Sequence, residues 1–196
     1  MPARTIERAQ AGDADAGDQL ARHCQRQAYL FALQLTGNPD DALDVAQEAL
    51  LRLFRTLARV DPTRPIRPYL LRIVRNLVWD QLRKRRVRKT HSLEDGGREL
   101  VLDPPDPALG PEELTQRREL QTILWSQLST LPARQREVVA LRDYMGLSYS
   151  EIARALRIPV GTVMSRLHRG RARLRKAVLA RTASGLGTFP KEVAHG

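Results

Sequence analysis

The sequence predicts an all-α protein of two small helical domains joined by an extended linker, and three observations support this. Apolar residues recur at helical spacing along most of the chain, and no stretch shows the alternation of a strand. Helix starts are well marked: Asn38 is a good N-cap, Pro39 suits the first helical position, and two aspartates follow at the positive end of the dipole. Residues 90–111 break the pattern with prolines, glycines and five acids against one base, which is typical of a linker.

The segments follow in a simple order. The expected boundaries are an N-terminal arm at 1–19, a first domain at 20–89, the acidic flexible linker at 90–111, a second domain at 112–180 and a tail at 181–196. The arm is small and polar, so we expect it to be loosely held. The first domain should contain helices that run from about residue 20 to 35, from residue 39 onward and from about residue 68 to 89.

Composition limits the classes of function. Lys and Arg number 33 against 22 acids, a formal charge of +11, which predicts affinity for polyanions such as nucleic acid. The single cysteine, Cys24, excludes an intramolecular disulfide and is typical of a packing thiol in a reducing compartment. Neither a signal peptide nor a membrane span is apparent, so we expect a cytoplasmic protein. We find no metal-ligand cluster, cofactor motif or nucleophile motif. We therefore expect that the protein binds no metal or cofactor and is not an enzyme.

The second domain carries a helix-turn-helix pattern. Ser148 and Glu151 form a capping box before a first helix that ends near Leu156, and a second helix is expected from about 160 to 176. That second helix holds six Lys or Arg residues and no acid, with Val163, Leu167, Gly170, Leu174 and Val178 on its apolar side. Such a face suits the major groove of DNA. The alternative is an ordinary helical hairpin with a solvated basic face.

The helix expected from 68 to 89 combines aromatic and basic residues. Its buried stripe should contain Leu70, Leu71, Val74, Leu77, Val78 and Leu82. The opposite face aligns Tyr69, Arg72, Asn76, Trp79 and Arg83, and six cations follow between residues 83 and 89. Rings that stack, an amide for a base edge and cations for phosphate suit unstacked nucleic acid. The alternative is that the aromatic residues pack against a neighbouring helix and that the basic run is only solvated.

The helix that starts at residue 39 has a different outward face. Its core stripe should contain Ala42, Val45, Ala46, Ala49, Leu50, Leu53, Phe54 and Leu57. The outward strip holds Leu43, Asp44, Gln47, Glu48 and Leu51. Acidic, amide and apolar groups together suit a protein partner rather than DNA. The alternative is a solvated face with two isolated leucines.

These motifs resemble those of a known family. Residues 44–55 (DVAQEALLRLFR) resemble sigma region 2.2, and residues 69–77 (YLLRIVRNL) with the basic run after them resemble regions 2.3 and 2.4. Residues 131–132, 136–138, 146–153 and 159–167 resemble region 4.2. The match covers about residues 20–89 and 112–178 in the right order, and no segment resembles regions 1.1 or 3. The chain is thus similar to the extracytoplasmic-function (ECF) sigma factors of the sigma-70 family.

The resemblance implies roles for these residues in transcription initiation. The strip Leu43, Asp44, Gln47, Glu48 and Leu51 would dock on the β′ clamp helices of core RNA polymerase, and region 4 on the β flap. Residues that would capture a flipped base and hold the −10 strand are Asn76 with the loop 61–67, including Arg64, Ile66 and Arg67, and then Tyr69, Arg72, Trp79, Arg83, Lys84, Arg85 and Arg86. At the −35 element Ser165, His168 and Arg169 would read bases, Thr162, Arg166 and Arg173 would hold phosphates, and Met164 would make apolar contact.

Further expectations follow from the same resemblance. An anti-sigma protein would hold the factor inactive, and the acidic linker would thread toward the active centre of polymerase. Tyr69 stands where a Trp is frequent in the family, and Met164 where a cation is frequent. Two other functions remain open on the residues alone: a helix-turn-helix regulator that acts without polymerase, and an RNA-binding helical protein that uses its basic run.

Overall fold

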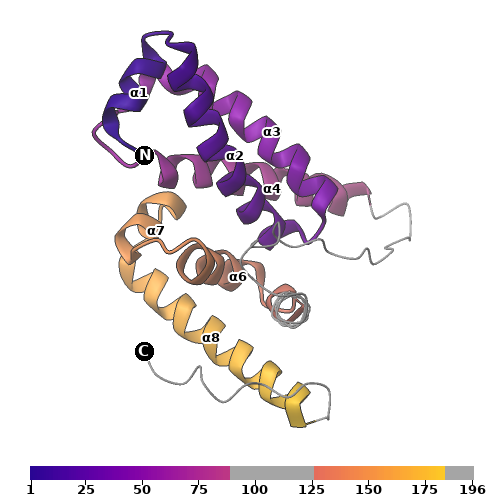
Figure 1. Cartoon of the computed structure of the whole chain (residues 1–196). Helices are drawn as coiled ribbons and strands as arrows, with labels where there is room; N and C mark the ends of the chain where they lie inside the picture. The colour runs from indigo at the N-terminus through magenta and orange to yellow at the C-terminus, as the bar shows by residue number, and fades with distance from the viewer. Residues whose placement is uncertain (89–125, 184–196) are drawn as a thin grey trace, which may run out of the picture.

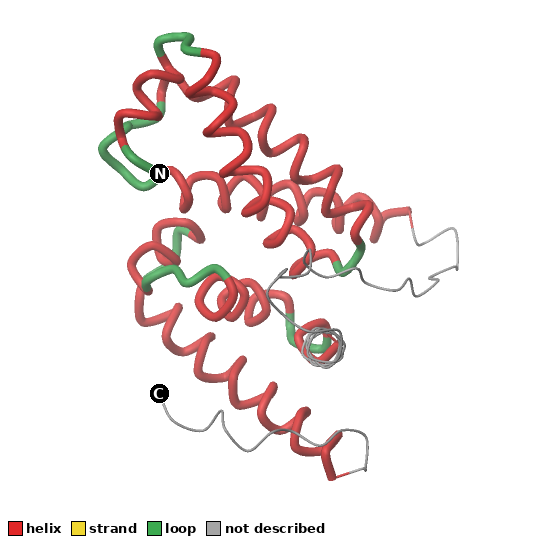
Figure 2. Tube along the Cα trace, viewed as in Figure 1, coloured by secondary structure: helices red, strands yellow, loops and turns green. Residues whose placement is uncertain are grey.

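The computed structural model describes residues 1–88 and 126–183, with side chains over residues 1–85 and 126–180. Every regular element in these ranges is helical (Figure 2). The helices form two groups, one made by the first 88 residues and one made by residues from 126 onward, which lie against each other (Figure 1). The predicted linker 90–111 and most of the predicted tail lie outside the described residues.

The first group contains five elements. These are α1 (Ala3–Gln10), α2 (Ala14–Thr36), α3 (Pro39–Thr56), the short 3₁₀ helix η1 (Leu57–Arg59) and α4 (Ile66–Arg88). The central helix is α2, which packs against α1, α3 and α4 and buries Leu20, Cys24 and Phe31 completely. It ends at Gly37, whose φ of 74° is the left-handed conformation that glycine adopts at little cost.

The expectation of a loosely held N-terminal arm was wrong. Residues 3–10 form α1, whose Ile6 is 1% exposed, and the Gln10 amide donates to the carbonyl oxygens of Leu57 and Val60 at 2.9 and 2.7 Å. The first long helix begins at Ala14, where the Asp13 carboxylate accepts a hydrogen bond from the backbone of Ala16. A helix of eight residues draws its stability from tertiary contacts, so local sequence gives little sign of it.

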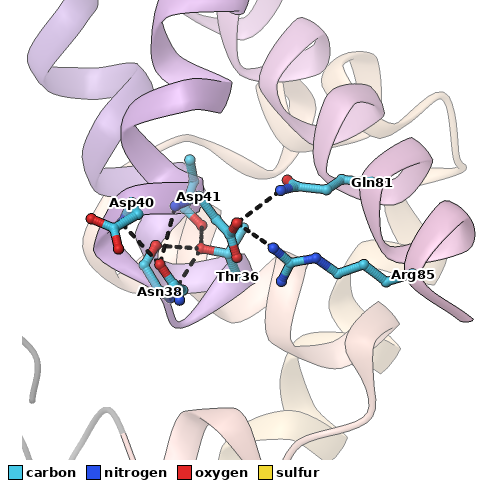
Figure 3. A network of polar contacts seen from close by, with 7 residues as sticks. Thr36, Asn38, Asp40, Asp41, Gln81 and Arg85 are labelled. Atoms are coloured by element: carbon cyan, nitrogen blue, oxygen red, sulfur yellow. Dashed lines mark hydrogen bonds and ion pairs between the residues drawn. The ribbon is translucent and has the colours of Figure 1, made fainter. Parts of the chain in front are cut away.

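The N-terminus of α3 is held as predicted. The Asn38 side chain accepts from the backbone N–H groups of Asp40 and Asp41 at 2.9 and 3.1 Å. Figure 3 shows that the Asp41 carboxylate also accepts from Gln81, at 2.9 Å, and from Arg85, both on α4. These contacts join the start of α3 to the last turns of α4, and they engage one cation of the basic run.

The second group contains the helix-turn-helix. Its elements are α6 (Ala133–Val139), the one-turn π-helix η2 (Ala140–Tyr144), α7 (Tyr149–Leu156) and α8 (Val160–Ala183). The capping box is present: the Ser148 N–H donates to the Glu151 carboxylate at 2.8 Å, and the Glu151 N–H donates to the Ser148 hydroxyl. Gly170 lets α8 approach α6 closely, because a Cβ there would lie 2.8 Å from a Val139 methyl carbon.

Most of the predicted apolar stripes are buried, with two clear exceptions. Phe54 and Leu82 are 37% and 38% exposed. Helical periodicity gives the direction of a side chain but not how far the neighbouring helices extend, so these two predictions were wrong. Leu50, Leu174 and Val178 are only partly buried.

The two groups share an interface. Helix α4 packs against α7, and α2 packs against α6 and η2. The buried apolar side chains of both groups form one continuous cluster that includes Leu33 and Val74 from the first group and Leu141 and Ile152 from the second. The face of α4 that the sequence assigns to nucleic acid therefore lies beside the second domain.

Candidate nucleic-acid and protein interfaces

The strip on α3 is exposed. Leu43 and Leu51 are 44% and 54% exposed, and Asp44 and Gln47 lie in solvent between them. Glu48 is half-buried and forms an ion pair with Arg52 at 2.7 Å, one helical turn away. Two leucines, an acid and an amide thus share one accessible strip of a helix whose other side is in the core. Such a surface can bind a protein through apolar anchors and polar groups that select the partner.

The outward face of α8 is open to solvent over most of its length. The exposed members of the predicted set are Met164, Ser165, His168, Arg169 and Arg173, and Thr162 is half-buried. The Arg169 guanidinium donates to the Ser165 carbonyl oxygen at 3.2 Å, which holds that side chain along the helix. Cationic and hydroxyl groups on an accessible helix can reach base edges and phosphates in a duplex groove.

Arg166 differs from its neighbours on α8. Its side chain is 18% exposed, and its Nη1 lies 3.3 Å from Oε1 of Glu137 on α6. The structure therefore places this residue in an ion pair within the domain. The prediction that it contacts phosphate finds no support in this arrangement.

The face of α4 is largely covered by the second domain. Arg72 donates through Nε to the Ala155 carbonyl oxygen at 3.2 Å and through Nη2 to that of Arg154. The Trp79 indole N–H lies 3.3 Å from Glu137 Oε2, and burial lowers the pKa of Arg72. Of the two possibilities that the sequence left open for Tyr69 and Trp79, the structure supports packing, because both are half-buried and the Tyr69 hydroxyl donates to Thr56 at 2.9 Å.

The remaining residues predicted on α4 are more accessible. Asn76 is exposed, as are Arg83 and Lys84, and the Arg83 side chain is 76% exposed although Asp80 lies 3.5 Å away. Arg85 pairs with Asp41 as described above, and the side chain of Arg86 lies outside the described residues. The helix therefore presents an open amide beside the covered Arg75 and Trp79, and open cations beyond them toward its C-terminus.

The loop 61–67 is ordered by Asp61. Its carboxylate accepts from the Thr63 N–H and hydroxyl at 3.0 and 2.6 Å and pairs with Arg64 at 3.0 Å, and the bonds from Thr63 chiefly lower the pKa of Asp61. A cavity of about 300 Å³ lies beside the loop. Its lining includes residues 59–61, 64–65 and 68–69, Arg72 and, from the second domain, Arg154.

Two members of the predicted base pocket lie elsewhere. Ile66 is 3% exposed and belongs to the core, so its side chain cannot meet a base. Asn76 lines a second cavity of about 670 Å³, between α4 and the second domain, and not the cavity beside the loop. In this structure Asn76 and the loop therefore line different cavities, since the loop leads into the first turn of α4 and Asn76 lies in the middle of that helix. Arg67 is half-buried, and burial lowers its pKa.

Sequence reasoning missed the residue at the centre of this interface. Glu137 is 0% exposed, and its Oε2 accepts from Arg75 at 2.8 Å and from Trp79, while its Oε1 pairs with Arg166. A carboxylate among the valines of α6 is a signal that could have drawn attention, because acids are rarely buried without partners. The sequence gives no sign that two of those partners, Arg75 and Trp79, come from the first domain.

Other kinds of site find little support in the described part of the chain. No group of three His, Cys, Asp or Glu residues there could hold a metal ion. No helix within the described ranges is long and apolar enough to cross a bilayer. Cys24 is buried, and burial raises the pKa of its thiol to about 11.

Comparisons with known proteins agree with this geometry. Residues 20–88 match the family model "Sigma-70 region 2", and residues 121–174 match "Sigma-70, region 4". The chain is 34% identical over 179 residues to the ECF RNA polymerase sigma factor SigW of Bacillus subtilis, a match that covers 90% of this chain and 96% of that protein. The chain belongs to the ECF sigma factors of the sigma-70 family. It is therefore an RNA polymerase sigma factor.

Further similarities support this family. The ECF sigma factor is 38% identical over 159 residues to the SigE factor of Mycolicibacterium smegmatis, where the match covers 81% of this chain and spans 60% of that protein's length. Its fold is similar to the sigma factor RpoE in the complex with the anti-sigma factor NepR from Bartonella quintana, with a TM-score of 0.69, 23% identity and coverage of 83% and 96% of the two chains. The structure of CnrH in complex with the cytosolic domain of CnrY gives a TM-score of 0.66 at 26% identity, with coverage of 91% and 97%.

Proposed function

We propose that this sigma factor directs core RNA polymerase to specific promoters through three surfaces. The strip on α3 binds the β′ clamp helices, the outward face of α8 reads the −35 duplex, and the α4 face with the loop 61–67 recognises and melts the −10 element. The observation that carries this proposal is the exposed strip of leucines and acids on α3, in a chain that also contains the two cation-rich helices α4 and α8. A helix-turn-helix regulator that acts alone has no use for that strip.

At the −35 element α8 acts as the recognition helix. Ser165, His168 and Arg169 are exposed along one side and are in a position to meet base edges, while Arg173 follows one turn later for phosphate. Met164, 52% exposed, adds an apolar contact. We assign Arg166 to the support of α8 through Glu137 rather than to phosphate.

At the −10 element the work divides between two places on the first domain. The cavity beside the loop receives the flipped base, and Asn76 lies farther along α4, toward the exposed cations Arg83 and Lys84. Flipping a base costs a few kcal/mol. Contacts that form only with the right base can offset this cost, so recognition and melting are one event. The chain carries out no catalysis in this scheme, because nucleotide addition belongs to the core enzyme.

Partners beyond promoter and polymerase follow from the relatives. The solved structures of RpoE and CnrH each contain a second protein, named in the former as an anti-sigma factor, and we propose that a protein of that kind also holds this factor inactive. A cytoplasmic location follows from the proposed work with polymerase.

Charge reversal on the α3 strip tests polymerase binding. Asp44→Arg should abolish co-purification with core enzyme and run-off transcription, because a cation replaces the exposed acid between two leucine anchors. Asp18→Arg is the matched control, since Asp18 is an exposed acid of the same domain outside the strip. Normal binding by Asp44→Arg would show that the α3 strip is not the polymerase-binding surface.

Truncation of the amide on α4 tests strand recognition. Asn76→Ala should reduce the fraction of open complexes on duplex promoters, because the exposed amide is the group on this face suited to a base edge. Permanganate footprinting of unpaired thymines measures the effect, and a promoter with a pre-melted −10 segment serves as the control. Equal opening by both proteins on duplex promoters would remove Asn76 from this role.

A further inference from the structure

The centre of the α4 face is bound by the other domain of the same chain. Arg72, Arg75 and Trp79 all donate hydrogen bonds from α4 to atoms of the second domain. Two guanidinium cations and an indole ring are groups of the kinds that bind a DNA strand. These three side chains cannot donate the same hydrogen bonds to the second domain and to a DNA strand at once. The second domain and a strand therefore compete for them.

Glu137 gives Arg75 and Trp79 the kind of acceptor that a phosphate would give. The carboxylate is 0% exposed, and its Oε2 lies 2.8 Å from Arg75 Nε and 3.3 Å from Trp79 Nε1. An anion held by a guanidinium and an indole N–H reproduces the charge and the acceptor of a phosphate oxygen. A neutral acceptor would satisfy the hydrogen bonds but not the charge of Arg75.

The end of α7 supplies further acceptors. The carbonyl oxygens of Arg154 and Ala155 belong to the last turn of that helix, where carbonyl groups lack partners within the helix. Arg72 donates to both of them, as a cation at a helix C-terminus does. Arg154 also lines the cavity beside the loop, so the same contact narrows the place assigned to a flipped base.

The carboxylate keeps a partner when the domains separate. Oε1 of Glu137 pairs at 3.3 Å with Arg166, which belongs to its own domain. Opening therefore exposes Arg75 and Trp79 without leaving a buried acid unpaired, and unpaired burial is the costly outcome. The domains can thus separate without the cost of an unpaired buried carboxylate.

We propose that Glu137, with the end of α7, closes the second domain over the strand-binding face of α4 and excludes single-stranded DNA until the domains separate. This Glu137 clasp rests on the proposed role of α4 in strand binding and adds its regulation. The strip on α3 and the face of α8 remain exposed in the closed form, so polymerase and the −35 duplex can bind before opening.

Glu137→Gln in the full chain tests the clasp. The variant keeps the size of the side chain and removes the charge that holds Arg75. We expect binding of a fluorescent oligothymidylate of about 16 nucleotides to tighten roughly tenfold in fluorescence anisotropy, as when a binding-competent form rises from a tenth of the population. The radius of gyration from X-ray scattering should rise in the same samples.

Asp143→Asn is the matched control. Asp143 is also an acid of the second domain that pairs with an α8 arginine, Arg171, but the pair does not involve the first domain. This variant should keep the compact shape and the wild-type affinity. Circular dichroism reports whether the domain of each variant is folded.

A second variant opens the interface at another point. The Arg136 guanidinium donates to the Leu35 carbonyl oxygen of α2 at 3.2 Å, so Arg136→Met removes a contact between the domains without touching Glu137. Arg136→Met should tighten binding of the same probe about threefold. If Glu137→Gln loses helical signal, Arg136→Met alone tests whether the contact between the domains excludes single-stranded DNA.

The outcomes separate the clasp from the proposed function. Compact shape and unchanged affinity in both variants would overturn the clasp and leave strand binding by α4 standing. Expansion of both variants without binding of the probe by any protein would overturn strand binding by α4, while the clasp would remain as the contact that closes the chain.

Discussion

Helices α4 and α8 both carry cation-rich faces, yet one is covered and the other is open. On α8 the side chains of Ser165, His168 and Arg169 lie in solvent, whereas Arg72, Arg75 and Trp79 on α4 bind the second domain. Similar composition therefore does not give similar availability. In the proposed scheme, duplex recognition by α8 needs no rearrangement of this chain, whereas strand recognition by α4 requires the domains to separate.

The difference arises from where each helix meets its neighbours. The apolar side of α8 packs on α6 and α7, with Val163 and Leu167 buried and Gly170 against α6, so the basic side faces outward. Helix α4 is packed on two sides, by α2 and α3 of its own domain and by α7 of the other. A helix with neighbours on two sides has a smaller free face than its sequence suggests.

The largest expected effect comes from filling the space between α6 and α8. Gly170→Val should lower the free energy of unfolding by about 3 kcal/mol, because its Cβ alone would lie 2.8 Å from a Val139 methyl carbon and branching adds a further clash. Urea denaturation measures the loss. Binding to a −35 duplex should fall with it, whereas the α3 strip should still bind core polymerase.

Gly161→Ala is the control for Gly170→Val. Gly161 lies in the first turn of α8, and a Cβ there meets no atom within 4 Å. Alanine should therefore raise the free energy of unfolding by up to about 1 kcal/mol through its better helix propensity. Equal losses from both substitutions would show that glycine flexibility, and not the close approach of α6, sets the behaviour of α8.

Sequence patterns predicted well what depends on neighbours along the chain. The Asn38 cap, the Ser148–Glu151 box and the exposed strip on α3 all follow from local spacing, and the structure shows each of them. The family was also predicted, because several motifs occur in the right order. These features need no knowledge of how the two domains meet.

What the sequence could not predict depends on contacts between distant residues. The half-burial of Trp79 and the central place of Glu137 follow from contacts with a second domain that periodicity cannot place, and the burial of Ile66 likewise depends on packing in the core. The fold of residues 1–19 was missed for a similar reason, since Gln10 donates to Leu57 of η1 and to Val60, far along the chain, and Ile6 is buried by tertiary packing.

Cys24 distinguishes separation of the domains from unfolding of the first domain. Burial raises its pKa from 9.0 to about 11, so the thiolate fraction near pH 8 should be roughly a hundredfold below that of the unfolded chain. Iodoacetamide should thus label Cys24 slowly in the wild type and equally slowly in Glu137→Gln. Fast labelling of Glu137→Gln alone would show that the variant unfolds the first domain instead of uncovering α4.

The same thiol gives a dependence on pH. Below pH 9.0 the thiol is neutral in folded and unfolded chains alike, and its burial counts fully toward stability. Between pH 9.0 and about 11 the unfolded chain ionises first, so stability falls as pH rises through this window. Cys24→Ala should remove that part of the fall in urea denaturation series, at the cost of a small cavity.

The smallest expected effect concerns the turn between α7, which packs against α4, and the open helix α8. Arg157 ends α7 with φ 54° and ψ 49°, a left-handed conformation that is costly for a residue with a Cβ. Its charge also lowers the pKa of Arg72, after the larger effect of burial, so the two cations repel each other across the interface. Arg157→Gly should raise the free energy of unfolding by about 0.5 kcal/mol, since relief of the backbone outweighs the greater entropy of glycine in the unfolded chain.

Arg157→Ala separates the two contributions, because it removes the charge and keeps the backbone cost. Urea denaturation should place it below the glycine variant in stability. Both variants should bind the oligothymidylate slightly less tightly than the wild type, because loss of the repulsion from Arg72 favours the closed form. Tighter binding by the alanine variant would mean that Arg157 holds the domains together, and the contrast between α4 and α8 would then depend on this turn rather than on Glu137.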